Sequence, residues 1–164
     1  MTSSTSVYSL TNTIVTEDDH ITPETNRQKT LLKTEHYLHN ISWCNTTICR
    51  LSGLVGPNRE IGKFLHQKKN IPGANSPVNL VHITDVVSII TSLIQQEIWN
   101  ETFNIVADKH PTKKECYSKA SSKCGLKTPE FNQEKNINYK IVSNEKIKKW
   151  LNYPFKKPDP MLFI

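Results

Sequence analysis

Hydrophobic and polar positions alternate along the chain with two different spacings. Short runs of apolar and β-branched residues between turn-forming residues are typical of strands, whereas apolar residues at every third or fourth position are typical of helices. Strand-like runs occupy residues 46–51, 78–82, 102–107 and 139–142, and residues 1–8 resemble the end of a strand. The clearest helical spacing follows Asp85, in Val86, Ile89, Ile90, Leu93 and Ile94.

A capping box predicts the N-terminus of two helices. In this motif two side chains each accept a hydrogen bond from the other residue's free backbone amide. The pairs are Thr25 with Gln28 and Thr112 with Glu115, and Gly125 is placed to close the second helix. The helix after Thr25 has a sparse apolar face. That face consists of Leu31, Leu32 and Leu38, and Glu35 lies on the same element.

The remaining helices are predicted from local pattern. We expect a short basic helix within residues 60–69, a helix capped by Asp85, and a last helix capped by Ser143. Residues 126–137 are predicted to be a polar loop. The side chains expected to face inward on the earlier helices are Ile61, Phe64, Leu65, Cys116, Ala120 and Cys124, and the last helix carries Ile147, Trp150 and Leu151.

Strands that alternate with helices predict an α/β fold with a mainly parallel sheet. The chain has 164 residues, which fits one domain of ordinary size. It carries 21 Lys and Arg against 15 Asp and Glu, but the lysines are spread out and no nucleic-acid motif accompanies them. We therefore interpret the charge as a solvated surface rather than a nucleic-acid site.

The four cysteines have neither zinc spacing nor a C-x-x-C pair, which favours buried free thiols in a reducing compartment. No apolar run reaches the roughly 20 residues that a membrane-spanning helix needs. These features predict a soluble, cytoplasmic protein.

The segment from Cys49 to Arg59 holds the densest candidate chemistry. A buried strand is followed by Gly53, Gly56 and Pro57, which predict a strained loop at the strand's carboxyl end. Ligand sites in open α/β sheets lie there, and Arg50 could meet an anion. The alternative is a strand, a turn and two solvated arginines. His82 has two interpretations as well, a ligand-binding or basic residue and a structural one.

Four segments in order resemble the NAD-dependent epimerase/dehydratase family of extended and atypical short-chain dehydrogenases/reductases. Residues 3–8 (Ser-Ser-Thr-Ser-Val-Tyr) resemble its Ser-Ser-x-x-Val-Tyr-Gly strand end, with Ser9 in place of the Gly. Residues 50–59 resemble its Arg-x-x-Gly-x-Tyr-Gly-Pro-x-Arg loop, with Val55 in place of the Tyr. Residues 81–87 resemble its His-Val-x-Asp-Val segment, and residues 103–106 resemble the following strand.

The resemblance implies a partial Rossmann-like, doubly wound sheet and a set of site residues. Ser4 would be the catalytic serine, and Arg59 and His82 would bind substrate, with His82 and Asp85 at the junction of the two regions. NAD or NADP would be the cofactor and a sugar nucleotide the substrate. The implied cofactor-binding residues are Arg50, Ser52, Gly53, Gly56 and Pro57.

The departures from the family predict impaired catalysis. Arg27 and Leu31 stand where the family has its Tyr-x-x-x-Lys pair, and neither can act as the tyrosine acid/base. The five glycines are scattered, and none forms a pyrophosphate-binding turn. We therefore expect a single partial domain, with residues 1–107 as the remnant of the NAD(P)-binding core and residues 108–164 as a smaller substrate-side region.

A half-sheet of this kind would expose an apolar edge. Because each ~100 Å² of exposed apolar surface forfeits about 2.5 kcal/mol, we expect a protein partner or self-association to cover that edge. The alternative function is a non-catalytic binding or regulatory module of the same fold that pairs with another chain.

Overall fold

The computed structural model describes residues 1–65, 68–132 and 137–164. The strands are β1 (Thr2–Ser4), β2 (Ile14–Val15), β3 (Ile48–Leu51), β4 (Gly53–Val55), β5 (Leu80–His82), β6 (Thr102–Ile105) and β7 (Ile141–Val142). The α-helices are α1 (Asn26–His39), α2 (Ile61–Leu65), α3 (Ile83–Gln95), α4 (Lys113–Lys123) and α5 (Glu145–Leu151). Two short 3₁₀ turns, η1 (Thr5–Val7) and η2 (Pro160–Leu162), complete the regular structure.

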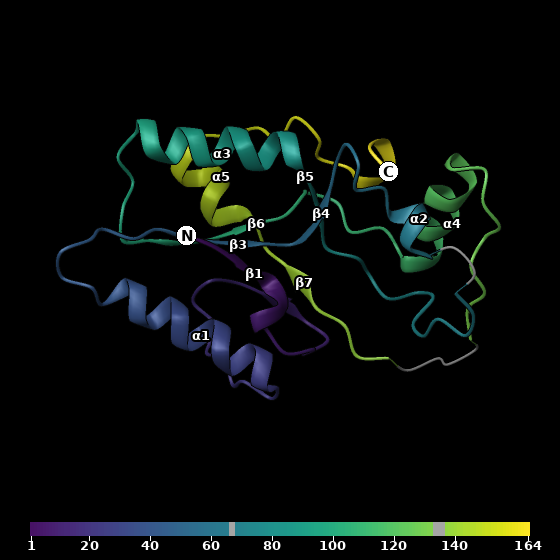
Figure 1. Ribbon diagram of the computed structural model, residues 1–164, viewed down its shortest axis with the longest axis horizontal. Coiled ribbons are helices and arrows are strands. Elements are labelled where there is room, and N and C mark those ends of the chain that lie inside the picture. Colours follow the sequence, from purple (N-terminus) through teal and green to yellow (C-terminus); the bar gives the residue numbers. More distant parts are fainter. Residues whose placement is uncertain (66–67, 133–136) are drawn as a thin grey trace.

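The predicted α/β class with mainly parallel strands is confirmed. A three-stranded sheet has the order β1-β3-β6, and two-stranded ladders join β2 to β7 and β4 to β5, with every pair parallel. In the central sheet Ser4 lies opposite Leu51, and Arg50 lies opposite Asn104. In Figure 1, α3 and α5 lie on one side of this sheet and α1 lies on the other.

The two faces of the central sheet differ in chemistry. Toward α3 and α5 the sheet presents Cys49, Phe103 and Ile105, which pack with buried residues of α3 such as Ile89. Alternate positions on the same strands point the other way and carry Ser3, Arg50 and Asn104, which are all buried. Helix α1 therefore covers a polar row, and its own buried residues are Gln28 and Glu35. This explains its sparse apolar pattern.

The segment after β3 is a strand and a tight turn rather than a strained loop. Gly53 begins β4, which pairs with β5, and neither Gly53 nor Gly56 has a positive φ. Close packing explains both glycines, because a Cβ on Gly53 would lie 2.7 Å from Leu80 and one on Gly56 would lie 2.5 Å from Ile83. Asn58, with φ 62°, adopts the left-handed conformation in a turn closed by the Arg59 amide on the Gly56 carbonyl.

The helix starts are only partly as predicted. Both capping boxes are confirmed. For α3 the prediction is wrong, because His82 caps the helix through its imidazole and Asp85 lies in the first turn. Ser143 precedes the true N-cap, Asn144, and its hydroxyl accepts the Glu145 amide at 3.3 Å.

Several inward positions also differ from expectation. Phe64 on α2 is 65% exposed, whereas Gly62 and Leu65 are the buried residues of that helix. On the last helix Ile147 is fully buried, whereas Trp150 is partly exposed and its ring packs on Phe103. The predicted basic helix and polar loop extend over residues 66–67 and 133–136, which lie outside the described residues.

All four cysteines are free thiols, but Cys44 is exposed and Cys124 half-buried, so the expectation of buried thiols holds only for Cys49 and Cys116. Among the described residues, no helix is both long enough and apolar enough to cross a membrane.

Candidate functional site

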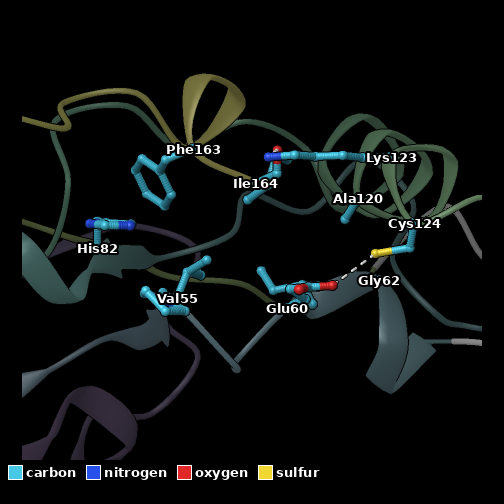
Figure 2. A pocket seen from close by; sticks show the side chains of 12 residues that line it. Val55, Glu60, Gly62, His82, Ala120, Lys123, Cys124, Phe163 and Ile164 are labelled. Atoms are coloured by element: carbon cyan, nitrogen blue, oxygen red, sulfur yellow. Dashed lines mark hydrogen bonds between the residues drawn. The ribbon is translucent and has the colours of Figure 1, made fainter.

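A cavity of about 390 Å³ opens between α2, α4, the end of β5 and the C-terminal segment (Figure 2). Its apolar walls come from Val55, Ile61, Ala120, Phe163 and Ile164. Its polar groups come from Glu60, His82, Lys123 and Cys124, and Gly56, Pro57 and Gly62 complete the lining. A pocket of this size, largely apolar with a few convergent polar groups, is the usual form of a small-molecule site.

Close backbone packing sets the shape of this cavity. Helix α2 approaches α4 so closely that a Cβ on Gly62 would lie 2.3 Å from the Ala120 carbonyl oxygen and 2.9 Å from the Cys124 sulfur. No side chain larger than hydrogen fits between the two helices at this point without moving them. Gly62 thereby lets Glu60 and Cys124 share one wall of the cavity, where the thiol donates to the Glu60 carboxylate at 3.4 Å.

His82 is held in a defined orientation on the opposite wall. Its Nδ1 accepts the Thr84 backbone amide at 3.2 Å, and its ring meets the Phe163 ring edge-on with centroids 5.4 Å apart. Burial, assisted by the nearby Lys157 ammonium, lowers the pKa of His82. The Thr84 contact leaves Nε2 as the nitrogen able to meet a ligand.

Charged groups around the cavity are unevenly paired. Glu60 forms an ion pair with Lys63 at 3.1 Å, and the contacts to Lys63 and Cys124 lower its pKa. The Lys123 ammonium donates to the backbone oxygen of Ile164 at 3.1 Å, and that of Lys119 donates to the backbone oxygen of Met161. Neither lysine forms an ion pair with an Asp or Glu side chain among the described residues.

The structure gathers three of the predicted site residues, Gly56, Pro57 and His82, in this cavity. Gly53 and Arg59 line a neighbouring hollow of about 280 Å³ instead, and the Arg59 side chain donates to the Leu54 carbonyl at 3.0 Å. Ser4 ends β1, and its hydroxyl accepts the Ser6 amide at 3.1 Å.

Arg50 lies in a buried network beneath α1. It is only 7% exposed, so the alternative of two solvated arginines is wrong for this residue. Its Nε contacts both Glu35 carboxylate oxygens at 3.2 Å, and its Nη2 donates to Oε2 at 2.7 Å. Its Nη1 donates to the Tyr8 hydroxyl at 2.8 Å, which donates in turn to Asn104 Oδ1 at 2.8 Å. Ser3 also donates to Glu35.

A second buried carboxylate ties the C-terminal segment to α3. Asp85 is fully buried and accepts the Tyr153 hydroxyl and the Lys156 amide at 2.8 Å, and the Lys157 amide at 3.0 Å. The chain after α5 is therefore anchored before it reaches the cavity. Asp85 thus fixes the loop after α5 against α3, and its expected role at the junction of two regions stays a prediction.

The positions expected for the Tyr-x-x-x-Lys pair do not form an acid/base pair. Arg27 is exposed on α1, and Leu31 packs against an apolar cluster that includes Val7 and Val15. Within the described residues, no cluster of three or more His, Cys, Asp or Glu side chains is arranged to hold a metal ion.

Sequence reasoning named only Gly56, Pro57 and His82 as site residues, and the cavity residues that it missed include Glu60, Lys123, Cys124, Phe163 and Ile164. Cys124 was expected to face inward, and the others had no local signal. Lys123 is one lysine among many, and Phe163 and Ile164 reach the cavity only because the last segment folds back over α4 and β5.

The chain matches no protein-family model. It is 36% identical over 162 residues to Protein YeeZ of Escherichia coli (strain K12), an alignment that covers 98% of this chain and 59% of YeeZ. The chain thus spans less than two thirds of this curated relative.

Solved structures resemble the chain over almost its whole length. A functionally unknown conserved protein from Silicibacter pomeroyi matches with a TM-score of 0.84 at 20% identity, covering 99% of this chain and 62% of that one. A putative NAD-dependent epimerase/dehydratase from Methylobacillus flagellatus matches with a TM-score of 0.77 at 22% identity, covering 99% of this chain and 60% of that one. UDP-glucuronic acid 4-epimerase from Bacillus cereus, in complex with UDP-glucuronic acid and NAD, matches with a TM-score of 0.78 at 18% identity, covering 99% of this chain and 57% of that one. The chain therefore has the Rossmann-like α/β fold of the epimerase/dehydratase structures, over about 60% of their length.

Proposed function

We propose that residues 1–164 are the substrate-side part of an NAD(P)-dependent epimerase/dehydratase-like protein of the sugar-nucleotide type. The observation that carries the proposal is that the structural match covers nearly all of this chain but little more than half of the matched protein. Nearly all of this chain matches a UDP-glucuronic acid 4-epimerase structure with NAD bound, yet only 57% of that protein is matched. We propose that the dinucleotide-binding half corresponds to the unmatched part and is not contained in residues 1–164.

In this proposal the cavity beside His82 receives the substrate. His82, the implied substrate-binding residue, lines it together with Gly56 and Pro57, which the resemblance implies for the cofactor, so we propose that these two residues lie where cofactor and substrate would meet. Arg59 lies in the adjacent hollow and would reach substrate only from its rim. Ser4 ends β1 opposite Leu51 and does not line this cavity, so its proposed hydrogen bond to the substrate oxygen requires a substrate that extends from the cavity toward β1.

The residues proposed to hold the cofactor fit it unequally. The Ser52 hydroxyl is buried and has no hydrogen-bond partner among the described residues, so a ligand atom beside Ser52 and Gly53 would satisfy it. Arg50 does not fit as a direct cofactor ligand, because Glu35 and Tyr8 already engage its guanidinium. It would act by fixing β3 and α1 beneath the site. When bound, a nicotinamide dinucleotide would supply hydride-transfer chemistry.

Catalysis by this chain is proposed to be impaired. With Arg27 and Leu31 in place of the tyrosine and lysine, α1 offers no phenol to exchange a proton with the substrate. The nearest tyrosine in the network, Tyr8, is buried, and burial raises its pKa, which disfavours the phenolate.

Complementation tests this proposal. The part of E. coli YeeZ that the chain does not match is expressed separately and mixed with residues 1–164. We expect the mixture to form a complex that binds NADH or NADPH, measured by nicotinamide fluorescence, with little turnover of UDP-sugars. A complex that forms but binds neither nucleotide would contradict the proposal.

A second candidate function, a non-catalytic module that pairs with another chain, is favoured by one surface. In the described sheet β1 pairs only with β3, which leaves its other edge free. Beside it lies a hollow of about 650 Å³ that includes Met1, Leu38, Ile90 and Trp99. A free strand edge next to apolar side chains is typical of an interface between polypeptides.

A matched pair of variants tests this surface. Ile94 and Val87 are both 57% exposed on α3, but only Ile94 lines the hollow. If the hollow is covered by a partner or a second copy, Ile94→Glu will weaken association in light scattering or pull-down, and Val87→Glu will not. A cooperative monomer in which both variants behave alike would contradict this second function.

A further inference from the structure

The imidazole of His82 belongs to two structures at once, the first turn of α3 and the wall of the cavity. His82 is the N-cap of α3, and its Nδ1 accepts the Thr84 backbone amide at 3.2 Å. The same ring lines the cavity and meets the Phe163 ring edge-on, and Figure 2 shows these two side chains next to each other at one end of the cavity. The ring therefore cannot swing away from the cavity without giving up its contact to α3.

The Thr84 contact fixes where the imidazole carries its proton. A backbone N–H can only donate, so Nδ1 must offer its lone pair, and the proton of the neutral ring must then lie on Nε2. Burial and the nearby Lys157 ammonium lower the pKa of His82 against the opposing effect of Asp85, which favours this neutral ring. Within the described part of the chain, Nε2 makes no hydrogen bond of its own.

This tautomer excludes one chemical role for His82. A general base needs a free lone pair, and the lone pair of this ring is already engaged by Thr84. Taking a proton from a ligand would turn Nδ1 into an N–H that faces the Thr84 N–H, which would leave the start of α3 uncapped. Donating a hydrogen bond from Nε2, in contrast, leaves the cap of α3 intact.

The other walls of the cavity indicate what this donor would meet. Val55 and Ala120 contribute apolar surface, and the Glu60 carboxylate is already engaged by Lys63 and by the Cys124 thiol. A fitting ligand would present an oxygen to Nε2 and carbon-bound hydrogens to the apolar walls. A sugar ring has both features, because its hydroxyl and ring oxygens accept hydrogen bonds while its C–H faces are apolar.

We propose that His82 is a hydrogen-bond donor and not a base in this cavity, and that its Nε2–H binds a hydroxyl or carbonyl oxygen of the ligand while its Nδ1 caps α3. His82 then selects ligands that place an acceptor oxygen at this end of the cavity. The choice of a sugar as the ligand rests on the proposed function, whereas the tautomer and the exclusion of a base rest on the contacts of His82 alone.

The ¹⁵N chemical shifts of the imidazole test the tautomer without any ligand. At about pH 7.5, a unit above the ordinary histidine pKa, we expect a pyridine-type Nδ1 and a pyrrole-type Nε2 for His82. His39, which is exposed on α1, should instead show the averaged shifts of two exchanging tautomers. A proton on Nδ1 of His82 would overturn the inference.

Two replacements separate the two contacts of the ring. Asn carries its amide near the position of Nδ1 and is a good N-cap, whereas Gln carries an amide N–H near the position of Nε2. His82→Asn should keep the Thr84 amide protected from hydrogen exchange but bind UDP-glucuronic acid about three- to tenfold more weakly, the loss expected for one neutral hydrogen bond. His82→Gln should keep most of the affinity but exchange the Thr84 amide about threefold faster or more. His39→Asn should match the wild type in both measurements.

UDP-glucuronic acid is the probe because a structural neighbour contains it, and NMR titration measures its affinity. Equal affinity of His82→Asn and the wild type would overturn the donor role. Failure of the probe to bind the wild type would overturn the assignment of a sugar. The complemented complex then decides the proposed function separately, since nicotinamide binding by that complex would leave the proposed function standing.

Discussion

The buried pair of Glu35 and Arg50 offers the sharpest test of how α1 is held on the sheet. Replacing Glu35 by Ala would leave the Arg50 cation, 7% exposed, without its counter-ion, and would also remove the acceptor of the Ser3 hydroxyl. Breaking a buried ion pair by deleting one partner typically costs about 3–5 kcal/mol. Against a total stability of about 5–15 kcal/mol, this is enough to unfold a marginal domain.

The magnitude follows from the contacts. The carboxylate meets Nε through both oxygens at 3.2 Å and Nη2 at 2.7 Å, and Tyr8 is the other partner of the guanidinium in the described network. Glu35→Gln keeps the shape and one acceptor oxygen, so we expect a smaller loss of about 2–3 kcal/mol, comparable to a hydrogen bond to a charged group.

Urea unfolding monitored by circular dichroism measures these losses, and two further variants keep the result interpretable. The double variant Glu35→Leu with Arg50→Met removes both charges and should recover most of the stability lost by Glu35→Ala. Glu145→Ala, at a carboxylate side chain 78% exposed, breaks a surface ion pair with Lys148 and should cost about 1 kcal/mol or less. If Glu35→Ala costs no more than Glu145→Ala, or the double variant is no more stable than Glu35→Ala, the reasoning about the buried pair is refuted.

Further predictions follow from other buried groups. Asp85→Ala should cost about 2–4 kcal/mol, because it leaves the Tyr153 hydroxyl and the Lys156 and Lys157 amides without their acceptor, whereas exposed Asp18→Asn should be close to neutral in the same urea experiment. Burial raises the pKa of Glu17, whose carboxylate accepts a hydrogen bond from the Asn104 backbone amide at 2.6 Å. The folded state therefore binds more protons than the unfolded state, and its stability should fall as pH rises from the ordinary glutamate pKa through the raised one. Glu17→Gln keeps an acceptor and should flatten that fall in urea unfolding experiments across pH 4–7, and equal slopes in the two proteins would contradict this prediction. Burial raises the pKa of Cys116 to about 12, so maleimide should label Cys44 first and Cys116 last by mass spectrometry, and early labelling of Cys116 would show that the α4 packing is wrong.

Much of the fold is predictable from local signals. Both capping boxes, the spacing of α3 and the runs that become β3, β5 and β6 depend on residues close together in the sequence. The same reasoning fails where a distant contact decides the outcome. Gly53 and Gly56 are typical of a loop, yet their role is set by Leu80 and Ile83, more than 25 residues away along the chain.

The candidate site is less predictable for the same reason. His82, Gly56 and Pro57 stand in recognisable segments, whereas Lys123 and Phe163 join them only through the return of the C-terminal segment. Arg50 shows the opposite difficulty. Its sequence position suggests a ligand-binding arginine, but the parallel register with Ser3 and Asn104 places it under α1, where Glu35 engages it.

The most direct test of the account is a titration of residues 1–164 alone with NADH and with NADPH, followed by nicotinamide fluorescence. The account predicts no saturable binding at concentrations up to millimolar, because the pyrophosphate-binding turn is proposed to lie in the unmatched part of the relatives. Saturable micromolar binding of either nucleotide by this chain alone would contradict it.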